Sequence, residues 1–505
     1  MNTKLSGSAV SGASVWRQPR TATHLLIGGF ALLHLLMASM VPLTAFETHY
    51  ALYGAHLDWS YIDHPPMVGW IQALVQWFSH SDLAMRVAPI VLMTLSQYLL
   101  VALVRRLFPD ESPWLSFVTL LVLQGATIVH ASIAMAPEVP LLLFGLAVVW
   151  FTHRVLQHPG LGNWLGLGVS LGLCGLSKYT GVTLALSLCL VLLLCRGPRF
   201  FFQRGFWLAV CAAGLLVSPV LIWNWQNDWA SFTYQLAYQM EDSGSQWSLH
   251  DALDMQLQQF GFYSPLLYVA GLAGALSSWG KRETGTRVLL CFALPILLVF
   301  TYTSGAGGTK VHWFLLGWVF LAPLAARWLM SHWQARAVRL LAMGSASLSV
   351  LVLLVALILP LPGLPFPDYG HPLSRLLGWE AASERAESLR RQWMAESGGE
   401  MPVVLVDNWH YAGPLAWYGH PTDVRYYGSS DNQYRIWYGR PQSDTRGILV
   451  LFDEKDRVPR ADWPDYDCQQ VDTLPALRGE VITRMFYFYR CAPAPDAAAA
   501  KEPAR

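Results

Sequence analysis

The chain has 505 residues, of which 54% are hydrophobic and only 13% are charged, and its formal net charge is +1. Soluble domains carry about 25% charged residues, so this composition indicates a protein solvated mainly by lipid. The near-zero net charge, without a basic block, argues against a nucleic-acid-binding protein. None of the seven cysteines has a metal-binding spacing such as Cys-x-x-Cys. The sequence therefore predicts a helical protein that crosses a membrane several times.

The chain begins with a polar segment and continues with apolar runs. Residues 1–20 are rich in Ser and Gly, which is typical of a disordered cytoplasmic tail. Residues 21–362 contain runs long enough to cross a bilayer, which takes about 17–25 residues in a helix. We predict about eleven spans, at residues 25–45, 86–104, 114–133, 137–153, 161–177, 180–195, 206–223, 260–279, 288–303, 313–329 and 340–361.

Lysine and arginine are distributed unevenly among the loops. They occur in every second loop, on the side of the N-terminus, as in Arg105-Arg106, Arg154 and Arg196. The opposite loops, 46–85 and 224–258, contain neither residue. Because cytoplasmic loops are enriched in Lys and Arg, this pattern predicts a cytoplasmic N-terminus and an outer first loop. With an odd number of spans, the chain after about residue 363 also lies outside.

Residues 363–492 differ from the preceding sequence because charged residues become common. We expect an amphipathic helix at 376–397. Two buried strands are expected at 403–406 and 448–452, with a helix at 409–418 between them, and a further strand at 481–489. This alternation predicts a small α/β domain outside the cytoplasm, named the outer domain below. Residues 493–505 are expected to form a disordered tail.

The outer domain contains two cysteines, Cys468 and Cys491. Its predicted compartment permits disulfides, so one interpretation is that the two residues pair. The other is that they are two buried free thiols. Spacing in the sequence does not decide between these interpretations, because pairing depends on the distance between the residues in the fold.

Titratable residues are concentrated in the stretch from residue 46 to residue 66, directly after the first span. It contains Glu47, His49, His56, Asp58, Asp63 and His64 but no Lys or Arg. Ionisable groups at a membrane are costly and are often functional. The alternative is an ordinary solvated loop that rests on the membrane.

Two positions in this stretch are candidates for catalysis. Glu47, beside His49, can serve as a general base or, with a histidine, as a metal ligand. Asp63 can orient or charge His64, and Pro65-Pro66 fix the backbone that presents both. The alternatives are a carboxylate that marks the water interface and a turn capped by Asp63.

Three lone cations interrupt the predicted outer side, which otherwise has none. They are Arg86, Lys178 and Lys310. A single cation often extends to lipid headgroups, but three together indicate a bound anion, and a phosphate suits them. Glu138, at the outer start of a span, and Asn224, among amides and indoles, are expected to line the same site. The tryptophans near Asn224 suit either sugar faces or the membrane interface.

Several of these stretches together resemble the bacterial glycosyltransferase family 39 set. This set comprises the protein O-mannosyltransferase-like and lipid A aminoarabinose-transferase-like enzymes of the C-type glycosyltransferase superfamily. The resemblance lies in His56–Pro66, Arg86, Ala136–Pro140, Leu176–Thr180, Trp223–Trp229 and Lys310–Trp313, and in the outer domain in Asp407, Ala416–Tyr418 and Asn432–Tyr434. It covers nearly the whole chain from about residue 24, and Asp63-His64-Pro65-Pro66 is its most specific part.

The resemblance implies a C-type fold and a reaction on the outer face of a bacterial inner membrane. In it a sugar passes from a polyprenyl phosphate to an acceptor. By matching positions, Arg86, Lys178 and Lys310 would hold the donor phosphate, and His312 would line the site. The family usually has Asp-Glu at the start of the first outer loop, with the Asp as base, whereas this chain has Phe46-Glu47. Either Glu47 or Asp63 serves as the base, or the reaction differs, or the chain no longer catalyses it.

The sequence thus predicts a glycosyltransferase that acts on a lipid, glycan or protein acceptor. The alternative is a non-catalytic binder or translocator of polyprenyl-linked lipids, which the missing acid at position 46 would allow. No cofactor is certain. A divalent metal is considered, with Glu47, His49 and His312 as candidate ligands. Membrane lipid is an expected partner, and nucleic acid is not.

Overall fold

The structure is a computed structural model that describes residues 18–241, 247–361, 363–367, 370–419, 422–428, 430–442, 444–452 and 466–494. Most of the two predicted tails, residues 1–17 and 495–505, lies outside the described residues. Pro19 and Arg20, which were assigned to the N-terminal tail, belong to the first helix.

The helices, in chain order, are α1 (Pro19–Ser39), α2 (Ala45–Ala55), α3 (Met67–Gln76), α4 (Asp82–Leu107), α5 (Leu115–Gln124), α6 (Thr127–Ala131), α7 (Glu138–Gln157), α8 (Leu161–Ser177), α9 (Val182–Arg196), α10 (Arg204–Gln226), α11 (Ala230–Glu241), α12 (Leu249–Phe262), α13 (Pro265–Ser278), α14 (Thr284–Ser304), α15 (Leu315–Ser331), α16 (Arg336–Ile358), α17 (Trp379–Ser397), α18 (Trp409–Tyr418) and α19 (Gln433–Tyr438). The strands are β1 (Val403–Val406), β2 (Val424–Tyr426), β3 (Gly447–Phe452), β4 (Tyr466–Arg478) and β5 (Val481–Pro493).

The chain divides into two compact units. The helical unit comprises residues 1–36, 89–221 and 236–353, and the mixed unit comprises residues 37–88, 222–235 and 354–505. The mixed unit thus groups loop 46–85 with the C-terminal sheet domain, because α2 packs against α18 within it.

Among the described residues, eight helices are long and apolar enough to cross a membrane. The pair α12–α13, bent by 110°, would add a ninth span. The remaining two predicted spans correspond to α8 and to the run 114–133, which breaks after Gln124 into α5 and α6. The polytopic helical architecture is therefore confirmed, whereas the number of eleven spans is not.

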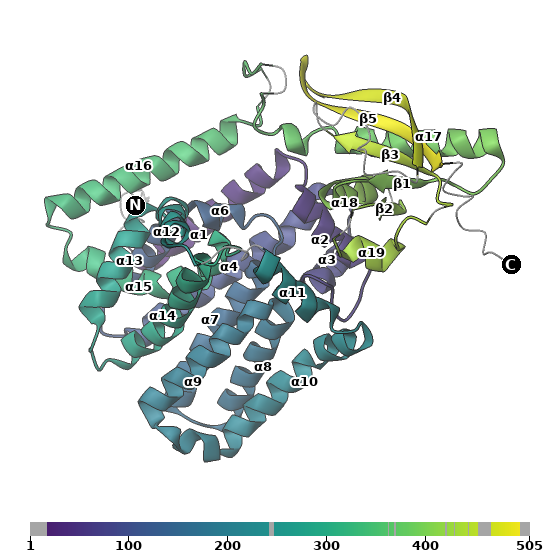
Figure 1. Ribbon diagram of the computed structural model, residues 1–505. Helices are drawn as coiled ribbons and strands as arrows, with labels where there is room; N and C mark the ends of the chain where they lie inside the picture. The colour runs from purple at the N-terminus through teal and green to yellow at the C-terminus, as the bar shows by residue number, and fades with distance from the viewer. Residues whose placement is uncertain are drawn as a thin grey trace, which may run out of the picture. The chain divides into compact units, whose positions relative to one another are not determined.

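The core of the helical unit is built around α15. All residues from Leu315 to Ala326 are buried, and the helix packs against α5, α13 and α14. Close approach of α13 requires Gly274, because a Cβ there would lie 2.5 Å from the carbonyl oxygen of Leu324. By contrast, only 6% of the apolar window of α16 is buried, so most of the apolar side chains of this helix are exposed. Figure 1 shows α7, α8 and α9 side by side in the same unit.

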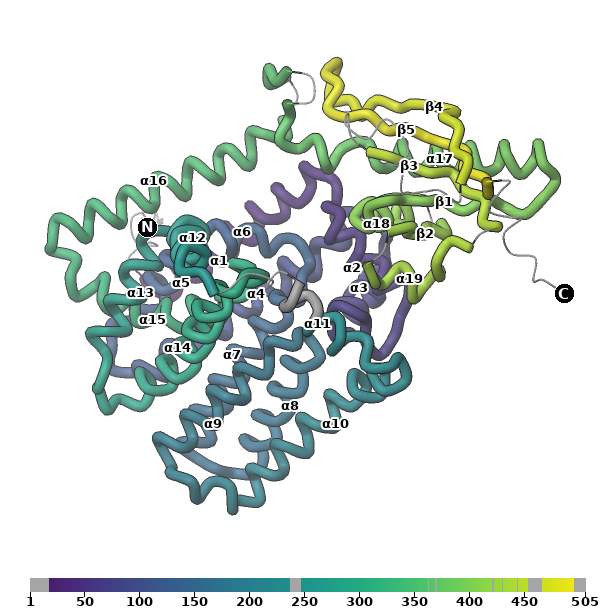
Figure 2. The backbone as a smooth tube through the Cα atoms, in the orientation of Figure 1, coloured from purple at the N-terminus to yellow at the C-terminus, as the bar shows by residue number. Residues whose placement is uncertain are grey.

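The sheet of the mixed unit has the strand order β2-β1-β3-β5-β4. Strands β2, β1 and β3 are parallel, and β3, β5 and β4 are antiparallel. Side chains of α17 and α18, such as Trp379 and Leu415, form one apolar core with Val404 and Phe486 of the sheet. The predicted α/β domain is confirmed. The prediction lacked two strands, β2 and β4. Strand β4 lies next to β5 at the yellow end of the chain in Figure 2.

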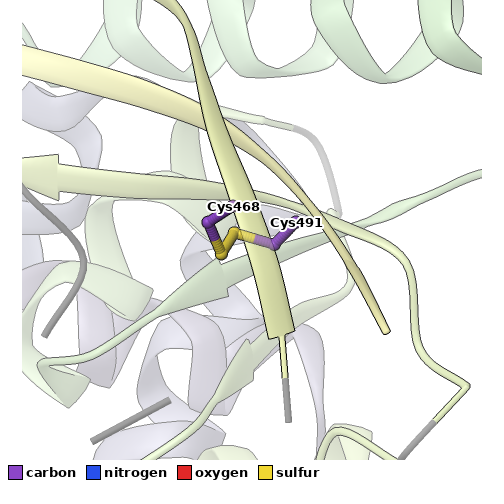
Figure 3. Close-up of a disulfide and its surroundings, with 2 residues drawn as sticks. All are labelled: Cys468 and Cys491. Carbon is purple, nitrogen blue, oxygen red and sulfur yellow. A yellow bond between two sulfur atoms is a disulfide. The ribbon is translucent and has the colours of Figure 1, made fainter. Parts of the chain in front are cut away.

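The pairing of Cys468 and Cys491 is resolved in favour of a disulfide. The two residues lie opposite each other on β4 and β5, and their sulfur atoms are bonded (Figure 3). We expect the double variant Cys468→Ser/Cys491→Ser to lower the free energy of unfolding of the outer domain by about 3 kcal/mol, because the bond closes a loop of moderate length.

Hydrogen exchange of β4 and β5 in the detergent-solubilised protein measures this loss. The variant Cys189→Ser, which changes a free and half-buried thiol, is the control. Equal protection of β4 and β5 in the double variant and the control would contradict the expectation.

Candidate functional site

Glu47 lies in the first turn of α2, where the local sequence forms a reciprocal cap. The Thr44 hydroxyl accepts a hydrogen bond from the N–H of Glu47 at 3.2 Å, and the Glu47 carboxylate accepts one from the N–H of Thr44 at 2.9 Å. This exchange satisfies two N–H groups at the helix end and fixes the start of α2. The predicted base thus also has a structural role.

The Glu47 carboxylate forms a buried ion pair with Arg86. Nε and Nη2 of Arg86 donate to the two carboxylate oxygens at 2.6 and 2.7 Å, and both side chains are at most 3% exposed. Nη1 and Nη2 also donate to the carbonyl groups of Ala38, Val41 and Pro42 at 2.7–2.9 Å. Because these bonds use all five N–H groups, Arg86 could bind a phosphate only by losing some of them. Its role as a phosphate ligand stays a prediction.

The carboxylate of Asp63 is hydrogen-bonded to an imidazole, that of His49. The Asp63 Oδ2 and His49 Nε2 atoms are 3.1 Å apart, and the Tyr53 hydroxyl donates to Oδ1. On its other side, His49 Nδ1 lies 2.9 Å from the hydroxyl of Tyr434 on α19. The ring of His64, which we expected beside Asp63, lies 5.7 Å from the ring of Tyr50.

These contacts set the protonation state of Asp63. Burial alone would raise the pKa of this carboxyl, but the neighbouring His49 and the hydrogen bonds from His49 and Tyr53 outweigh burial and hold the pKa well below its usual range. Asp63 is therefore ionised at neutral pH. The Asp63 side chain is 17% exposed, so a ligand can reach it, whereas the Glu47 side chain is only 3% exposed.

Asn224, which was predicted to line the site, is buried and stabilises the turn after α10. Its side-chain oxygen accepts a hydrogen bond from the N–H of Ser231 at 3.1 Å. Its carbonyl accepts one from the N–H of Trp229, a residue with a φ of 59° that non-glycine residues rarely adopt. The adjacent Trp223 donates its indole N–H to Asp58 at 2.7 Å, which links this segment to the loop between α2 and α3.

In the helical unit, three predicted site residues meet at helix ends. Glu138 begins α7, Lys178 follows the last residue of α8, and His312 lies in the 3₁₀ turn Val311–Phe314 before α15. The Lys178 ammonium donates to Oε1 of Glu138, and His312 Nε2 lies 3.2 Å from the same oxygen. The ammonium also lies 5.6 Å from the ring centroid of Trp313, a cation–π distance.

A small, partly open pocket lies beside this cluster. Its apolar walls come from Leu141, Ile296, Phe300, Trp313, Leu315 and Leu316, and its polar groups from Glu138, Lys178, Thr180, Thr183 and His312. The Lys178 side chain is only 6% exposed, whereas that of His312 is 44% exposed. Lys310, two residues before His312, is exposed. The pocket thus combines an apolar lining with a nearly buried cation.

Among the described residues, no group of three or more His, Cys, Asp and Glu side chains is arranged to hold a metal ion. Of the candidate ligands, Glu47 binds Arg86, and both ring nitrogens of His49 have protein partners. The divalent metal therefore stays a prediction.

Comparisons with known proteins agree with the predicted resemblance. Residues 63–223 match the family model described as dolichyl-phosphate-mannose-protein mannosyltransferase. Lipid A galacturonosyltransferase RgtD from Rhizobium johnstonii is 23% identical over 442 residues, which are 85% of this chain and 90% of that protein. The structure of ArnT from Cupriavidus metallidurans bound to undecaprenyl phosphate superposes with a TM-score of 0.65 over 92% of this chain and 97% of ArnT, at 14% identity. The chain has the ArnT fold.

The apo structure of the same ArnT gives a TM-score of 0.64 over 95% of this chain and 98% of that chain, at 13% identity. The multi-pass membrane fold with a small C-terminal sheet domain is thereby confirmed. The comparisons support the predicted glycosyltransferase class and give no support to the non-catalytic binder or translocator.

Two features of the mixed unit were not predicted as parts of a site. Tyr434 is a hydrogen-bond partner of His49, and His410 lies against Phe46. The available signal was the position of Asn408, two residues after a buried strand and directly before the next helix, where a polar residue caps that helix. The partners themselves are distant in sequence and could not be inferred from spacing.

Proposed function

We propose that this protein transfers a sugar from a polyprenyl phosphate to the glycan of a lipid A-type acceptor, on the outer face of a bacterial inner membrane. The observation that carries the proposal is the pocket beside Glu138, Lys178 and His312. Its apolar walls suit an isoprenoid chain, and its nearly buried ammonium suits a phosphate. The ArnT that shares this fold binds undecaprenyl phosphate.

In this proposal, Lys178 is the principal phosphate ligand and Glu138 positions it. A phosphate that enters the pocket replaces Glu138 as the partner of the ammonium, and the exposed Lys310 adds positive charge at the entrance. When the bond between the anomeric carbon and the phosphate oxygen breaks, negative charge develops on the leaving polyprenyl phosphate. A lysine fixed in a largely apolar pocket stabilises that charge without reorganising water.

The acceptor hydroxyl must lose its proton as its oxygen bonds to the anomeric carbon. Of the two predicted bases we assign this role to Asp63, because Glu47 gives both oxygens to Arg86 and is nearly inaccessible. Asp63 is ionised and partly exposed, and hydrogen bonds from His49 and Tyr53 hold its carboxylate in place, so the proton of the acceptor hydroxyl passes to this carboxylate. Glu47 then maintains the loop that carries Asp63.

The acceptor class is proposed from a relative that aligns with 85% of this chain and across 90% of its own length, a lipid A galacturonosyltransferase. A direct test reconstitutes the full chain in nanodiscs with lipid A and undecaprenyl phosphate that carries galacturonic acid, aminoarabinose or mannose. We expect transfer of at least one of these sugars to lipid A, detected by mass spectrometry. Absence of transfer from all three would contradict the proposal.

The variant Asp63→Asn tests the assignment of the base in the same assay. We expect the rate of transfer to fall by about a hundredfold or more, since general base catalysis contributes at least that much. Binding of undecaprenyl phosphate should be retained. The control is Asp58→Asn, which alters a carboxylate of the same loop that accepts a hydrogen bond from Trp223. A larger loss of rate in the control than in Asp63→Asn would assign the base elsewhere.

A further inference from the structure

Three aromatic rings meet at the start of α18 in the mixed unit. Phe46 is 54% exposed although its side chain is large and apolar. Its ring lies 5.4 Å from that of His410, edge to face, and the His410 ring stacks on Trp409 at 3.8 Å. Because aromatic rings provide a flat apolar surface, an open cluster of this kind suits the apolar face of a sugar ring.

The hydrogen bonds of Asn408 define the tautomer of His410. The Asn408 side-chain oxygen accepts the cap hydrogen bond from the backbone N–H of His410 at 3.1 Å, so this atom is an acceptor. The same oxygen lies 3.0 Å from Nδ1 of the His410 ring, and Nδ1 therefore carries the proton. In the part of the chain that the structure describes, Nε2 has no hydrogen-bond partner, and its lone pair can accept one from a ligand.

The surroundings of His410 keep it neutral. Partial burial lowers its pKa from the ordinary value of 6.5, and two further groups, His49 on α2 and Arg375 in the 3₁₀ turn Ser374–Leu376, act in the same direction. At neutral pH the imidazole is therefore an acceptor at Nε2 rather than a cation.

The cluster also lies at the carboxyl end of β1, where the chain reverses its direction across the sheet. From β1 the chain passes through α18 to β2 on one side and then returns to β3 on the other, so β1 lies between two parallel neighbours. In α/β sheets, ligands bind at the carboxyl ends of strands at this kind of reversal.

We propose that Phe46, Trp409 and His410 form a subsite that binds one sugar ring of the acceptor glycolipid, with a sugar hydroxyl donating to Nε2 of His410. This aromatic subsite extends the proposed function and rests on it. It assigns acceptor recognition to residues of the mixed unit and leaves phosphate binding to the Lys178 pocket of the helical unit.

The test is the Michaelis constant for lipid A in the transfer assay at saturating donor. We expect His410→Phe, which keeps a ring but removes the acceptor nitrogen, to raise this KM about tenfold, the effect of one lost hydrogen bond. Phe46→Ala should raise it similarly without touching the core, since the residue is half exposed. For both variants, kcat and the Kd for undecaprenyl phosphate should stay within about twofold of wild type.

The matched control is Phe78→Ala, because Phe78 is an equally aromatic and even more exposed residue of the same unit, outside the subsite. The pH dependence is a second readout. The KM of the wild type should rise as the pH falls below 6.5 and Nε2 is protonated, whereas the KM of His410→Phe should not respond. A structural role of His410 would not produce this difference.

Two outcomes would overturn the subsite on its own. One is wild-type transfer combined with an unchanged KM for lipid A in both Phe46→Ala and His410→Phe. The other is a loss of kcat in these variants without a change in KM. If the wild-type protein transfers no sugar, the proposed function is wrong, and the subsite proposal, which depends on it, is wrong too. The two failures are therefore distinguished by the activity of the wild-type protein.

Discussion

Replacing Lys178 with Met is expected to lower the affinity for undecaprenyl phosphate about 10- to 100-fold, the effect of losing a charge-assisted hydrogen bond. The loss of transfer, as kcat/KM, should reach about a thousandfold or more, because the leaving phosphate then lacks its stabilising cation. The variant also leaves Glu138 in the pocket without the ammonium, and this carboxylate repels the incoming phosphate. Binding of fluorescent undecaprenyl phosphate and the transfer assay measure the two effects separately.

Glu138→Gln is the matched variant, and its expected effect on affinity has the opposite sign. Removing the carboxylate leaves the Lys178 ammonium without its competing anion, so undecaprenyl phosphate should bind as tightly as in wild type or a few-fold more tightly. The control Thr180→Val alters a pocket side chain that carries no charge. Unchanged affinity in Lys178→Met, or equal losses in all three variants, would refute the phosphate assignment.

Replacing Arg86 with Met is expected to destabilise the protein by about 3–5 kcal/mol, because it leaves a buried carboxylate without its partner. The three carbonyl groups of Ala38, Val41 and Pro42 also lose their donors. The double variant Arg86→Met/Glu47→Gln should recover part of the loss, since it removes the uncompensated charge. Thermal unfolding in detergent, followed by tryptophan fluorescence, measures these differences.

The same pair of variants tests the phosphate role predicted for Arg86. If Arg86 is mainly a structural partner of Glu47, the double variant binds undecaprenyl phosphate nearly as well as wild type. A weak destabilisation of Arg86→Met combined with a large loss of undecaprenyl phosphate affinity would reverse this interpretation and make Arg86 a donor ligand.

The fold was largely predictable because its signals are local. Apolar runs, and the occurrence of Lys and Arg in every second loop, identified the spans. Residues 409–418 were predicted to be helical, and they form α18 in the structure. The strand β4 was missed because it lies at the sheet edge, where one face is solvated and a residue such as Pro475 is tolerated. Its polar sequence lacks the alternation that identifies half-buried strands.

The site was only partly predictable because its partners are distant in sequence. Arg86, Lys178 and Lys310 were grouped as lone cations, since the sequence does not reveal that Arg86 pairs with Glu47 or Lys178 with Glu138. The local order Asp63-His64 suggested a pair, yet α2 brings His49 to the Asp63 carboxylate. Composition and motif therefore identified the right segments, whereas tertiary packing determined which charges neutralise each other.

The most direct test of the central claim is an experimental structure of the full chain with undecaprenyl phosphate bound. The account predicts that phosphate oxygens lie within hydrogen-bonding distance of the Lys178 ammonium, about 2.7–2.9 Å, and that Glu138 has moved away from it. The isoprenoid chain should follow Leu141, Ile296 and Leu316 along the pocket wall. A phosphate bound elsewhere, with the Lys178–Glu138 pair intact, would contradict the account.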